Sequence, residues 1–261
     1  MSGLRGIVLD MEGVLHVDWR AIPGSPEAVA ELQARGFATG VLTNPTGKTR
    51  ADIAERLGSM GFPIAAGQIT TAASAAAAHL RSQHPGKRVY ALVESGATGD
   101  LDGIELVDDP AEAEVVLMGG PDESWTYSRL NSVFLALLGG VPLVAMQRNR
   151  WWTTAAGPAL DAGMFVTGLE YAAAADGVVI GKPSPAVYRT ACALLGVAPA
   201  EAMMVGDDPD SDLAPARAIG MRTCLVRTGK GASFGIAEAD LDLADLAALP
   251  AELGVWHPQR A

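Results

Sequence analysis

Short apolar runs that stop at a polar residue recur near both ends of the chain. The first two lie at residues 7–9 and 37–42, and polar side chains follow each of them at once. Continuous apolar runs of this length are typical of strands that are buried on both faces of a parallel sheet. Between them, residues 25–36 carry apolar positions at helical spacing and end in glycine. The pattern therefore predicts a β-α-β unit at the start of the chain.

The same rhythm returns after residue 185. A helical pattern runs to residue 195, and apolar runs follow at 202–205 and 221–226 with a second helical pattern between them. Strands that alternate with helices of this length form doubly wound parallel sheets. We therefore expect the two ends of the chain to build one sheet together.

The pattern of apolar and polar residues changes past residue 70. There an alanine-rich helical pattern is followed by a second series of predicted strands and helices. Strands are predicted at 89–93, 115–118, 143–146 and 178–180, and helices at 125–138 and 165–175. The predicted fold class is thus α/β, with a doubly wound, Rossmann-like parallel sheet as its core. Residues 1–78 and 179–261 form this core domain, and residues 79–178 form an inserted α/β domain.

Polar residues follow four of the predicted strands. Because ligands of an open parallel sheet bind outside the carboxyl ends of its strands, these residues are candidates for a single site. They are Asp10, Thr43 with Asn44, Lys182, and Asp207 with Asp208 and the nearby Asp212. Attacking and metal-binding carboxylates, a hydroxyl, backbone amides and a lysine are the parts of a phosphoryl-transfer site.

The motifs around these residues resemble those of a known superfamily. In the same order, the chain carries four motifs similar to those of the haloacid dehalogenase superfamily: Asp10-Met11-Glu12-Gly13-Val14, Leu42-Thr43-Asn44, Gly181-Lys182-Pro183, and Gly206-Asp207-Asp208 through Asp212. The insert resembles the large α/β cap domain of one branch. Within that branch, the string Arg227-Thr228-Gly229-Lys230 is among the features most similar to the group of phospholysine phosphohistidine inorganic pyrophosphate phosphatases.

The resemblance implies a phosphatase that hydrolyses a small phosphorylated metabolite through an aspartyl-phosphate. Asp10 would be the nucleophile, and Thr43 and Asn44 would bind the transferring phosphoryl group. Lys182 would hold Asp10 and the phosphate together against their mutual repulsion. Such help is needed because two anions must approach each other during the reaction.

The resemblance also implies a Mg²⁺ site. Asp10, the backbone carbonyl of Glu12 and Asp207 would bind the ion. Asp208 or Asp212 would hold metal-bound water or orient the ligands. Oxygen ligands of this kind suit a hard divalent cation.

Glu12 departs from the family pattern, in which active relatives usually carry aspartate. That acid protonates the leaving group and later deprotonates the attacking water. Glutamate keeps the carboxyl but reaches further by about 1.5 Å, and a misplacement near 1 Å can cost on the order of a hundredfold in rate. We therefore expect a slow enzyme. In the competing interpretation Glu12 pairs with a neighbouring arginine and takes no part.

Two other functions compete with the phosphatase. The first is a catalytically weak or inactive member that binds a phosphorylated ligand, and the substitution at Glu12 motivates it. The second is attack on carbon, as in dehalogenation. It is disfavoured because Asp207 and Asp212 imply a metal that this chemistry does not need.

Structural roles compete for several of these residues. Asp208, Asp210 and Asp212 could cap the helix that follows, since acidic side chains stabilise the first turn of a helix. Lys182 could be an ordinary surface residue. Three tryptophans of the insert are predicted as core rather than as a binding platform. They are Trp125, Trp151 and Trp152.

Composition narrows the classes of function. With 19 Lys and Arg against 30 Asp and Glu, the net charge is −11, which disfavours binding to nucleic acid or anionic lipid. The longest apolar stretch, 133–146, is shorter than the roughly 18 residues of a membrane span. Both cysteines fit the core of a protein in a reducing compartment. We expect a cytoplasmic protein without a membrane segment. The sequence is compatible with a monomer or a homodimer.

Overall fold

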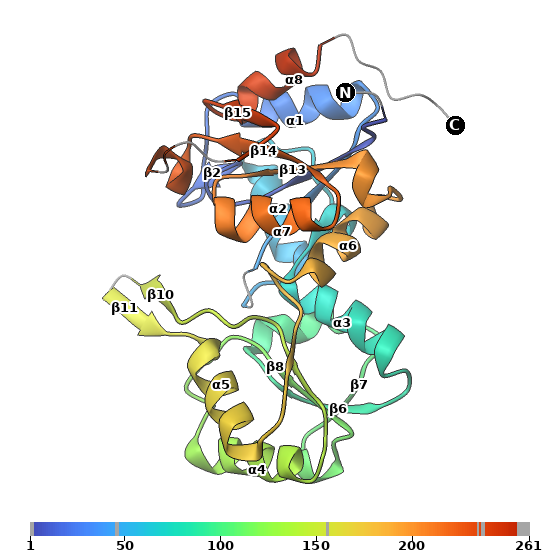
Figure 1. Cartoon of the computed structure of the whole chain (residues 1–261), viewed down its shortest axis with the longest axis vertical. Helices are drawn as coiled ribbons and strands as arrows, with labels where there is room; N and C mark the ends of the chain where they lie inside the picture. Colours follow the sequence, from blue (N-terminus) through green and yellow to red (C-terminus); the bar gives the residue numbers. More distant parts are fainter. Residues whose placement is uncertain (1–2, 45–46, 155–156, 234, 236–237, 255–261) are drawn as a thin grey trace. The chain divides into compact units, whose positions relative to one another are not determined.

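The computed structural model describes residues 3–44, 47–154, 157–233, 235 and 238–254. The chain forms two compact units, each with a parallel sheet of its own (Figure 1). The first unit comprises Met1–Thr43, Arg50–Thr70 and Lys182–Ala261, and the second comprises Asn44–Thr49 and Thr71–Gly181. The predicted α/β fold, with a parallel core sheet and a second α/β sheet, is confirmed. The domain boundaries at 79 and 178 stay a prediction.

The sheet of the first unit has six parallel strands in the order β5, β4, β1, β13, β14, β15. Their bounds are β1 (Gly6–Leu9), β4 (Ala38–Leu42), β5 (Ile69–Thr70), β13 (Ala202–Gly206), β14 (Arg222–Val226) and β15 (Leu241–Leu243). This corresponds to the Rossmann strand order 3-2-1-4-5-6, whose direction of winding reverses between its strands 1 and 4. The switch point of this sheet, where ligands of such folds bind, therefore lies between β1 and β13.

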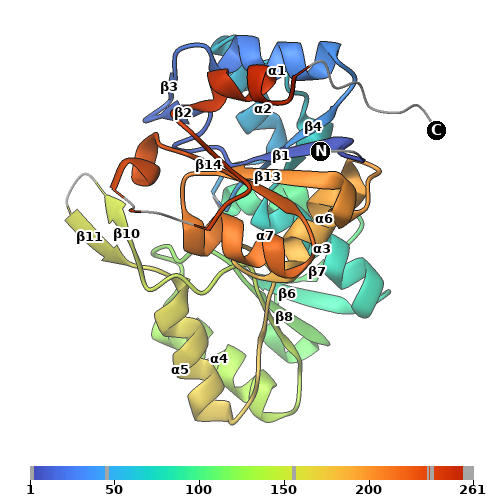
Figure 2. The same cartoon turned by 45° about the horizontal axis from the view of Figure 1, so that its top comes forward.

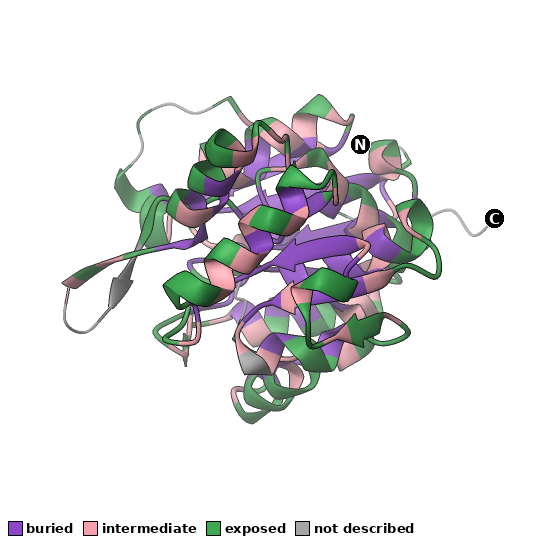
Figure 3. Ribbon diagram, turned by 90° about the horizontal axis from the view of Figure 1, so that it is seen from below, coloured by how far each residue is buried: buried purple, intermediate pink, exposed green. Residues whose placement is uncertain are grey.

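Helices cover both faces of this sheet, as Figure 2 shows. One face carries α1 (Ser25–Ala34), α2 (Arg50–Ser59) and α8 (Leu249–Glu252), and the other carries α6 (Pro185–Leu194) and α7 (Ala214–Ala218). Successive side chains of a strand point to opposite faces, so each strand supplies apolar contacts to both layers. The sheets are accordingly buried and the outer sides of the helices exposed (Figure 3).

The sheet of the second unit has five parallel strands in the order β12, β9, β8, β6, β7. Their bounds are β6 (Arg88–Leu92), β7 (Glu105–Val107), β8 (Val115–Met118), β9 (Leu143–Ala145) and β12 (Val178–Val179). The helices of this unit include α3 (Ala72–Gln83), α4 (Tyr127–Leu138) and α5 (Ala162–Ala173). An antiparallel hairpin, β10 (Trp151–Thr154) and β11 (Gly157–Leu160), lies outside the main sheet.

The tryptophans of the second unit have different surroundings. Trp125 is buried in the apolar cluster of this unit, with its ring centroid 5.1 Å from that of Phe165, which confirms its prediction as core. Trp151 is 57% exposed, so the same prediction was wrong for it. It lies on the two-stranded hairpin, which has less apolar surface to cover it than the main sheet. The side chain of Trp152 lies outside the described residues.

Two expectations from composition bear on the fold. Among the described residues, we find no helix with the length and apolar character needed to cross a bilayer. Cys192 and Cys224 are both buried thiols without a disulfide. They pack as small core residues, as predicted.

Candidate active site

Asp10 and Asp207 lie next to each other because their strands are neighbours at the centre of the first sheet. β1 pairs with β13 in parallel, with Leu9 opposite Val205. Asp10 follows β1, and its N–H donates to the Val205 carbonyl at 2.9 Å, so the ladder continues past the strand. Asp207 follows β13 directly. The two carboxylates therefore meet at the switch point of the sheet.

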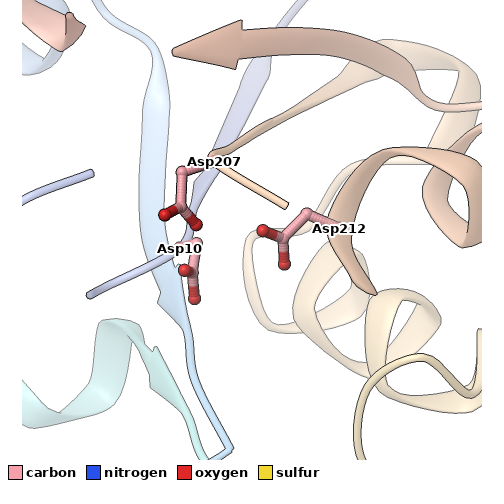
Figure 4. A group of neighbouring side chains, drawn as sticks. All are labelled: Asp10, Asp207 and Asp212. Carbon is pink, nitrogen blue, oxygen red and sulfur yellow. The ribbon is translucent and has the colours of Figure 1, made fainter. Parts of the chain in front are cut away.

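Asp212 joins them from a short π-helix, Pro209–Leu213, that follows Asp207. Its side chain is buried, and its Oδ2 accepts a hydrogen bond from the Asp208 N–H at 3.3 Å. One carboxylate oxygen from each of Asp10, Asp207 and Asp212 lies within 4.8 Å of the others. The carboxyl groups of Asp10, Asp207 and Asp212 are turned toward one another (Figure 4).

Lys182 binds two of these carboxylates. Its Nζ lies 2.6 Å from Oδ1 of Asp10 and 2.8 Å from Oδ1 of Asp212. The side chain is only 8% exposed, so the interpretation of Lys182 as an ordinary surface residue was wrong. Burial alone would lower the pKa of Lys182, but the two carboxylates hold it above its ordinary value. Lys182 is therefore a permanent cation inside the acidic cluster.

Burial dominates the titration of the carboxylates. It raises the pKa of Asp207 and of Asp212 to about 6, and it raises the pKa of Asp10 above its ordinary value although Lys182 opposes the change. Buried carboxylates in close contact retain protons unless a cation offsets their charge. One lysine offsets only part of three negative charges. Because carboxylate oxygens are preferred ligands of Mg²⁺, this donor set fits a hard divalent cation.

Thr43 and Asn44 follow β4, the neighbour of β1. Leu9 is paired with Val41, so Thr43 extends the sheet edge that also carries Asp10. Thr43 is buried, and its N–H donates to a carbonyl of β5 at 3.0 Å. Asn44 is the first residue of the second unit. The phosphate-binding role of both residues stays a prediction.

Glu12 directs its side chain toward its own loop. The carboxylate lies 2.9 Å from Nδ1 of His16 and accepts a hydrogen bond from the Asp18 N–H at 2.9 Å. A two-residue hairpin turn, with Asp18 and Trp19 at φ 50° and 58°, returns the chain toward Glu12. The Glu12 side chain is 55% exposed, unlike the buried cluster. Its partner is thus a histidine and not the arginine considered from the sequence.

This arrangement does not suit a general acid. Although partial burial alone would raise the pKa of Glu12, hydrogen bonds from His16 and Asp18 hold it below its ordinary value. A general acid works best when its pKa is near the operating pH. His16 is itself buried and stacks on Trp19, with 4.5 Å between the ring centroids. The geometry therefore favours a structural role in which Glu12 closes the loop.

We expect Glu12→Gln to change kcat by less than about tenfold, well below the hundredfold or more that general acid–base groups contribute. The amide oxygen can still accept the Asp18 N–H bond, so the loop should keep its conformation. Steady-state kinetics on the best substrate, with Glu55→Gln on the exposed side of α2 as the control, measures this. A fall of about a hundredfold would show that the carboxyl leaves His16 and transfers protons.

Asp208 has a structural role in this structure. Its Oδ1 accepts hydrogen bonds from the N–H groups of Asp210 and Ser211, each at 3.1 Å, and so caps the π-helix. Its Oδ2 lies 2.9 Å from Nζ of Lys230. The geometry supports the interpretation of Asp208 as a cap, and its role at the metal stays a prediction. Asp210 is exposed in the first turn of that helix.

Two further residues that do not directly follow a predicted strand contact the segments of the site. Tyr188, on α6, donates its hydroxyl hydrogen bond to the Ser211 carbonyl and so braces the turn before Asp212. The N–H of Lys230 donates to Oδ2 of Asp207 at 2.7 Å. In the sequence, residues 227–230 are marked only by the family resemblance. A helix residue and a loop after β14 carry no local signal of contact with the site.

Family models and known proteins similar to this chain agree on one family, the haloacid dehalogenase-like hydrolases. A family model described as haloacid dehalogenase-like hydrolase matches residues 7–106, and one described as HAD-hydrolase-like matches residues 179–248. Haloacid dehalogenase-like hydrolase domain-containing protein 2 from Homo sapiens is 36% identical over 227 residues, which are 87% of this chain and 85% of that protein.

Two phosphatases are also similar. Phospholysine phosphohistidine inorganic pyrophosphate phosphatase from Homo sapiens is 35% identical over 236 residues, which are 88% of this chain and 85% of that protein. The structure of a p-nitrophenyl phosphatase from Archaeoglobus fulgidus superposes with a TM-score of 0.86 at 27% identity, over 96% of this chain and 99% of that one.

Proposed function

This chain belongs to the haloacid dehalogenase-like hydrolases, and we propose that it is a Mg²⁺-dependent phosphatase that hydrolyses a small phosphorylated metabolite. The observation that carries the proposal is the buried cluster of Asp10, Asp207 and Asp212 with Lys182 bonded inside it. Such a cluster is costly to the fold, because charges removed from water must be compensated. It is well suited to hold a cation beside a nucleophilic carboxylate.

In the proposed reaction, an oxygen of Asp10 attacks the phosphorus atom of the substrate. The bond from phosphorus to the leaving oxygen breaks, and the aspartyl-phosphate formed is then hydrolysed by water at phosphorus, which regenerates the Asp10 carboxylate. Lys182 stays 2.6 Å from Asp10 and offsets the charge of two anions that must meet. Thr43 and the Asn44 amide would bind the phosphoryl oxygens.

Mg²⁺ would be held by the carboxylates of Asp10 and Asp207 and the backbone carbonyl of Glu12. When bound, it supplies positive charge that stabilises the transferring phosphoryl group. Asp212, through its bond to Lys182, keeps the lysine aimed at Asp10 and adds negative charge to the site. For Glu12 to transfer a proton to the leaving group, its carboxyl would have to separate from His16.

A weak or inactive member that binds a phosphorylated ligand is the second candidate. The specific observation in its favour is the Glu12 carboxylate held by His16 and Asp18, since a carboxylate engaged in these bonds is poorly placed to protonate a leaving group. Such a protein would bind phosphate esters in the presence of Mg²⁺ and release little phosphate.

Release of p-nitrophenol from p-nitrophenyl phosphate, with Mg²⁺ and then with excess chelator, tests the function. We expect hydrolysis with Mg²⁺ and only background after chelation, because the carboxylates repel the substrate phosphate when their charge is not offset. A panel of phosphorylated metabolites then defines the substrate. Full activity in chelator would contradict the metal dependence, and binding without turnover would favour the second candidate.

A further inference from the structure

The loop after β14 lies against the carboxylate of Asp207. The N–H of Lys230 donates to its Oδ2 at 2.7 Å, across 23 residues of sequence. The Asp207 side chain is buried, so this bond is protected from competition by water. A hydrogen bond to a carboxylate is stronger than one between neutral groups. The loop therefore fixes the orientation of this carboxylate.

Two glycines leave the space that the carboxylate fills. A Cβ on Gly13 would lie 2.1 Å from Oδ2 of Asp207, and a Cβ on Gly229 would lie 2.3 Å from the same oxygen and 2.6 Å from the Gly13 Cα. Both glycines have positive φ, +85° and +52°, where other L residues are strained. Only backbone without side chains can approach Asp207 this closely from these two sides.

Two further contacts tie the loop to the site. Thr228 donates its hydroxyl hydrogen bond to the Gly13 carbonyl, which joins the loop to the segment that begins at Asp10. The Nζ of Lys230 lies 2.9 Å from Oδ2 of Asp208. The loop thus contacts both segments that carry the acidic cluster, and it contributes no carboxylate of its own to that cluster.

We propose that residues 228–230 position Asp207 as a metal ligand and thereby set the affinity of the site for Mg²⁺. The inference rests on the proposed function, which gives Asp207 its role. Gly229 and Lys230 act through Asp207, and Thr228 acts through Gly13, so all three are positioning residues. Groups that orient a metal ligand in this way typically account for 10- to 100-fold in metal affinity.

Two variants of the full chain test the proposal by calorimetric titration with MgCl₂ alone. Gly229→Ala places a methyl group where the Asp207 oxygen lies. Lys230→Pro replaces the donor hydrogen of the N–H by a ring carbon in the first turn of the 3₁₀-helix Gly229–Ser233, so the hydrogen bond to Asp207 is lost. We expect each variant to bind Mg²⁺ at least about tenfold more weakly than the wild type. The Mg²⁺ concentration for half-maximal p-nitrophenyl phosphate hydrolysis should rise in parallel.

Each variant has a matched control. Gly196 also has a positive φ, +67°, but a Cβ there would meet no described atom within 4 Å. Gly196→Ala therefore reproduces the backbone strain without the contact and should keep the wild-type Mg²⁺ affinity. Lys230→Ala removes the Nζ cation but keeps the N–H, so it should bind Mg²⁺ more tightly than Lys230→Pro, and the difference between the two isolates the N–H bond to Asp207. Urea unfolding of all variants separates loss of stability from loss of affinity.

The outcomes distinguish the inference from the proposed function. A wild-type chain that binds no Mg²⁺ overturns both. A wild-type chain that binds Mg²⁺ and hydrolyses the ester, with Gly229→Ala and Lys230→Pro binding Mg²⁺ equally well, overturns the inference alone. An equal loss of affinity in Gly196→Ala and Gly229→Ala would assign the effect to general backbone strain and would also overturn it.

Discussion

Asp10→Asn should reduce kcat for p-nitrophenyl phosphate by at least about a thousandfold, the scale on which loss of a nucleophile acts. The amide has nearly the same shape as the carboxyl but cannot attack phosphorus and return as a leaving group. The fold should remain intact, because burial already raises the pKa of Asp10 and a neutral side chain removes the cost of a buried charge. Steady-state kinetics and urea unfolding measure the two effects.

Asp210→Asn is the matched control for this substitution. Asp210 lies close to the site in sequence but is exposed, and its side chain is not part of the acidic cluster. It should therefore keep wild-type kcat. A phosphoryl group found on Asp10 by mass spectrometry after rapid acid quenching would identify the intermediate directly. If Asp10→Asn turned over at the wild-type rate, the assignment of the nucleophile would be wrong.

Lys182→Met should lower kcat by at least about a hundredfold, comparable to the loss of one transition-state donor in other enzymes. Methionine is of similar length but leaves Asp10 and Asp212 facing each other without a cation. Loss of one partner from a buried ion pair typically costs about 3–5 kcal/mol of stability. We expect a loss of this order in the metal-free protein near pH 7.5.

The pH dependence separates an electrostatic role of Lys182 from a packing role. Without the lysine, the pKa values of Asp10 and Asp212 should rise further, so the folded protein would bind protons more readily than the unfolded chain. The free energy of unfolding of the variant therefore falls as pH rises from 5 to 7.5. Its loss of stability relative to the wild type should be smaller at pH 5 than at pH 7.5. Urea unfolding in chelator measures it.

Lys87→Met is the control for loss of a lysine from an ion pair. Lys87 lies 2.6 Å from Glu114 but is 51% exposed, and exposed pairs contribute at most about 1 kcal/mol. This variant should show little change in stability at either pH. A deficit of Lys182→Met that is the same at both pH values would contradict the electrostatic explanation and indicate lost packing.

The sequence by itself determined the fold class and most of the sheet edge. Buried parallel strands are continuous apolar runs, and a polar residue marks where each run ends, so Asp10, Thr43 and Asp207 could be placed from local pattern alone. The rule that ligands bind at these strand ends then joined residues far apart in the chain. The resemblance to the superfamily is confirmed by the matching family models and relatives. Strands β5, β7 and β15 were not predicted, because each is two or three residues long and includes a polar residue, so no continuous apolar run marks it.

Only the tertiary structure decided which hydrogen-bond and ion-pair partners each acidic side chain has. The sequence allowed Asp208 and Asp212 either to cap a helix or to join the acidic cluster. In the structure Asp208 caps the π-helix, and Asp212 binds Lys182. It left Glu12 between catalysis and a structural pair, and a hairpin turn without the usual Asn-Gly signal brings His16 and Asp18 to it.

The contacts of residues 228–230 with Asp207 and Gly13 were likewise beyond the sequence. The bond from the Thr228 hydroxyl to the Gly13 carbonyl spans 215 residues, and the bond to Asp207 comes from the backbone N–H of Lys230, a group that every residue except proline carries. The local sequence pattern shows which residues can take part in chemistry. Long-range packing decides which of their polar atoms are already engaged in hydrogen bonds and ion pairs.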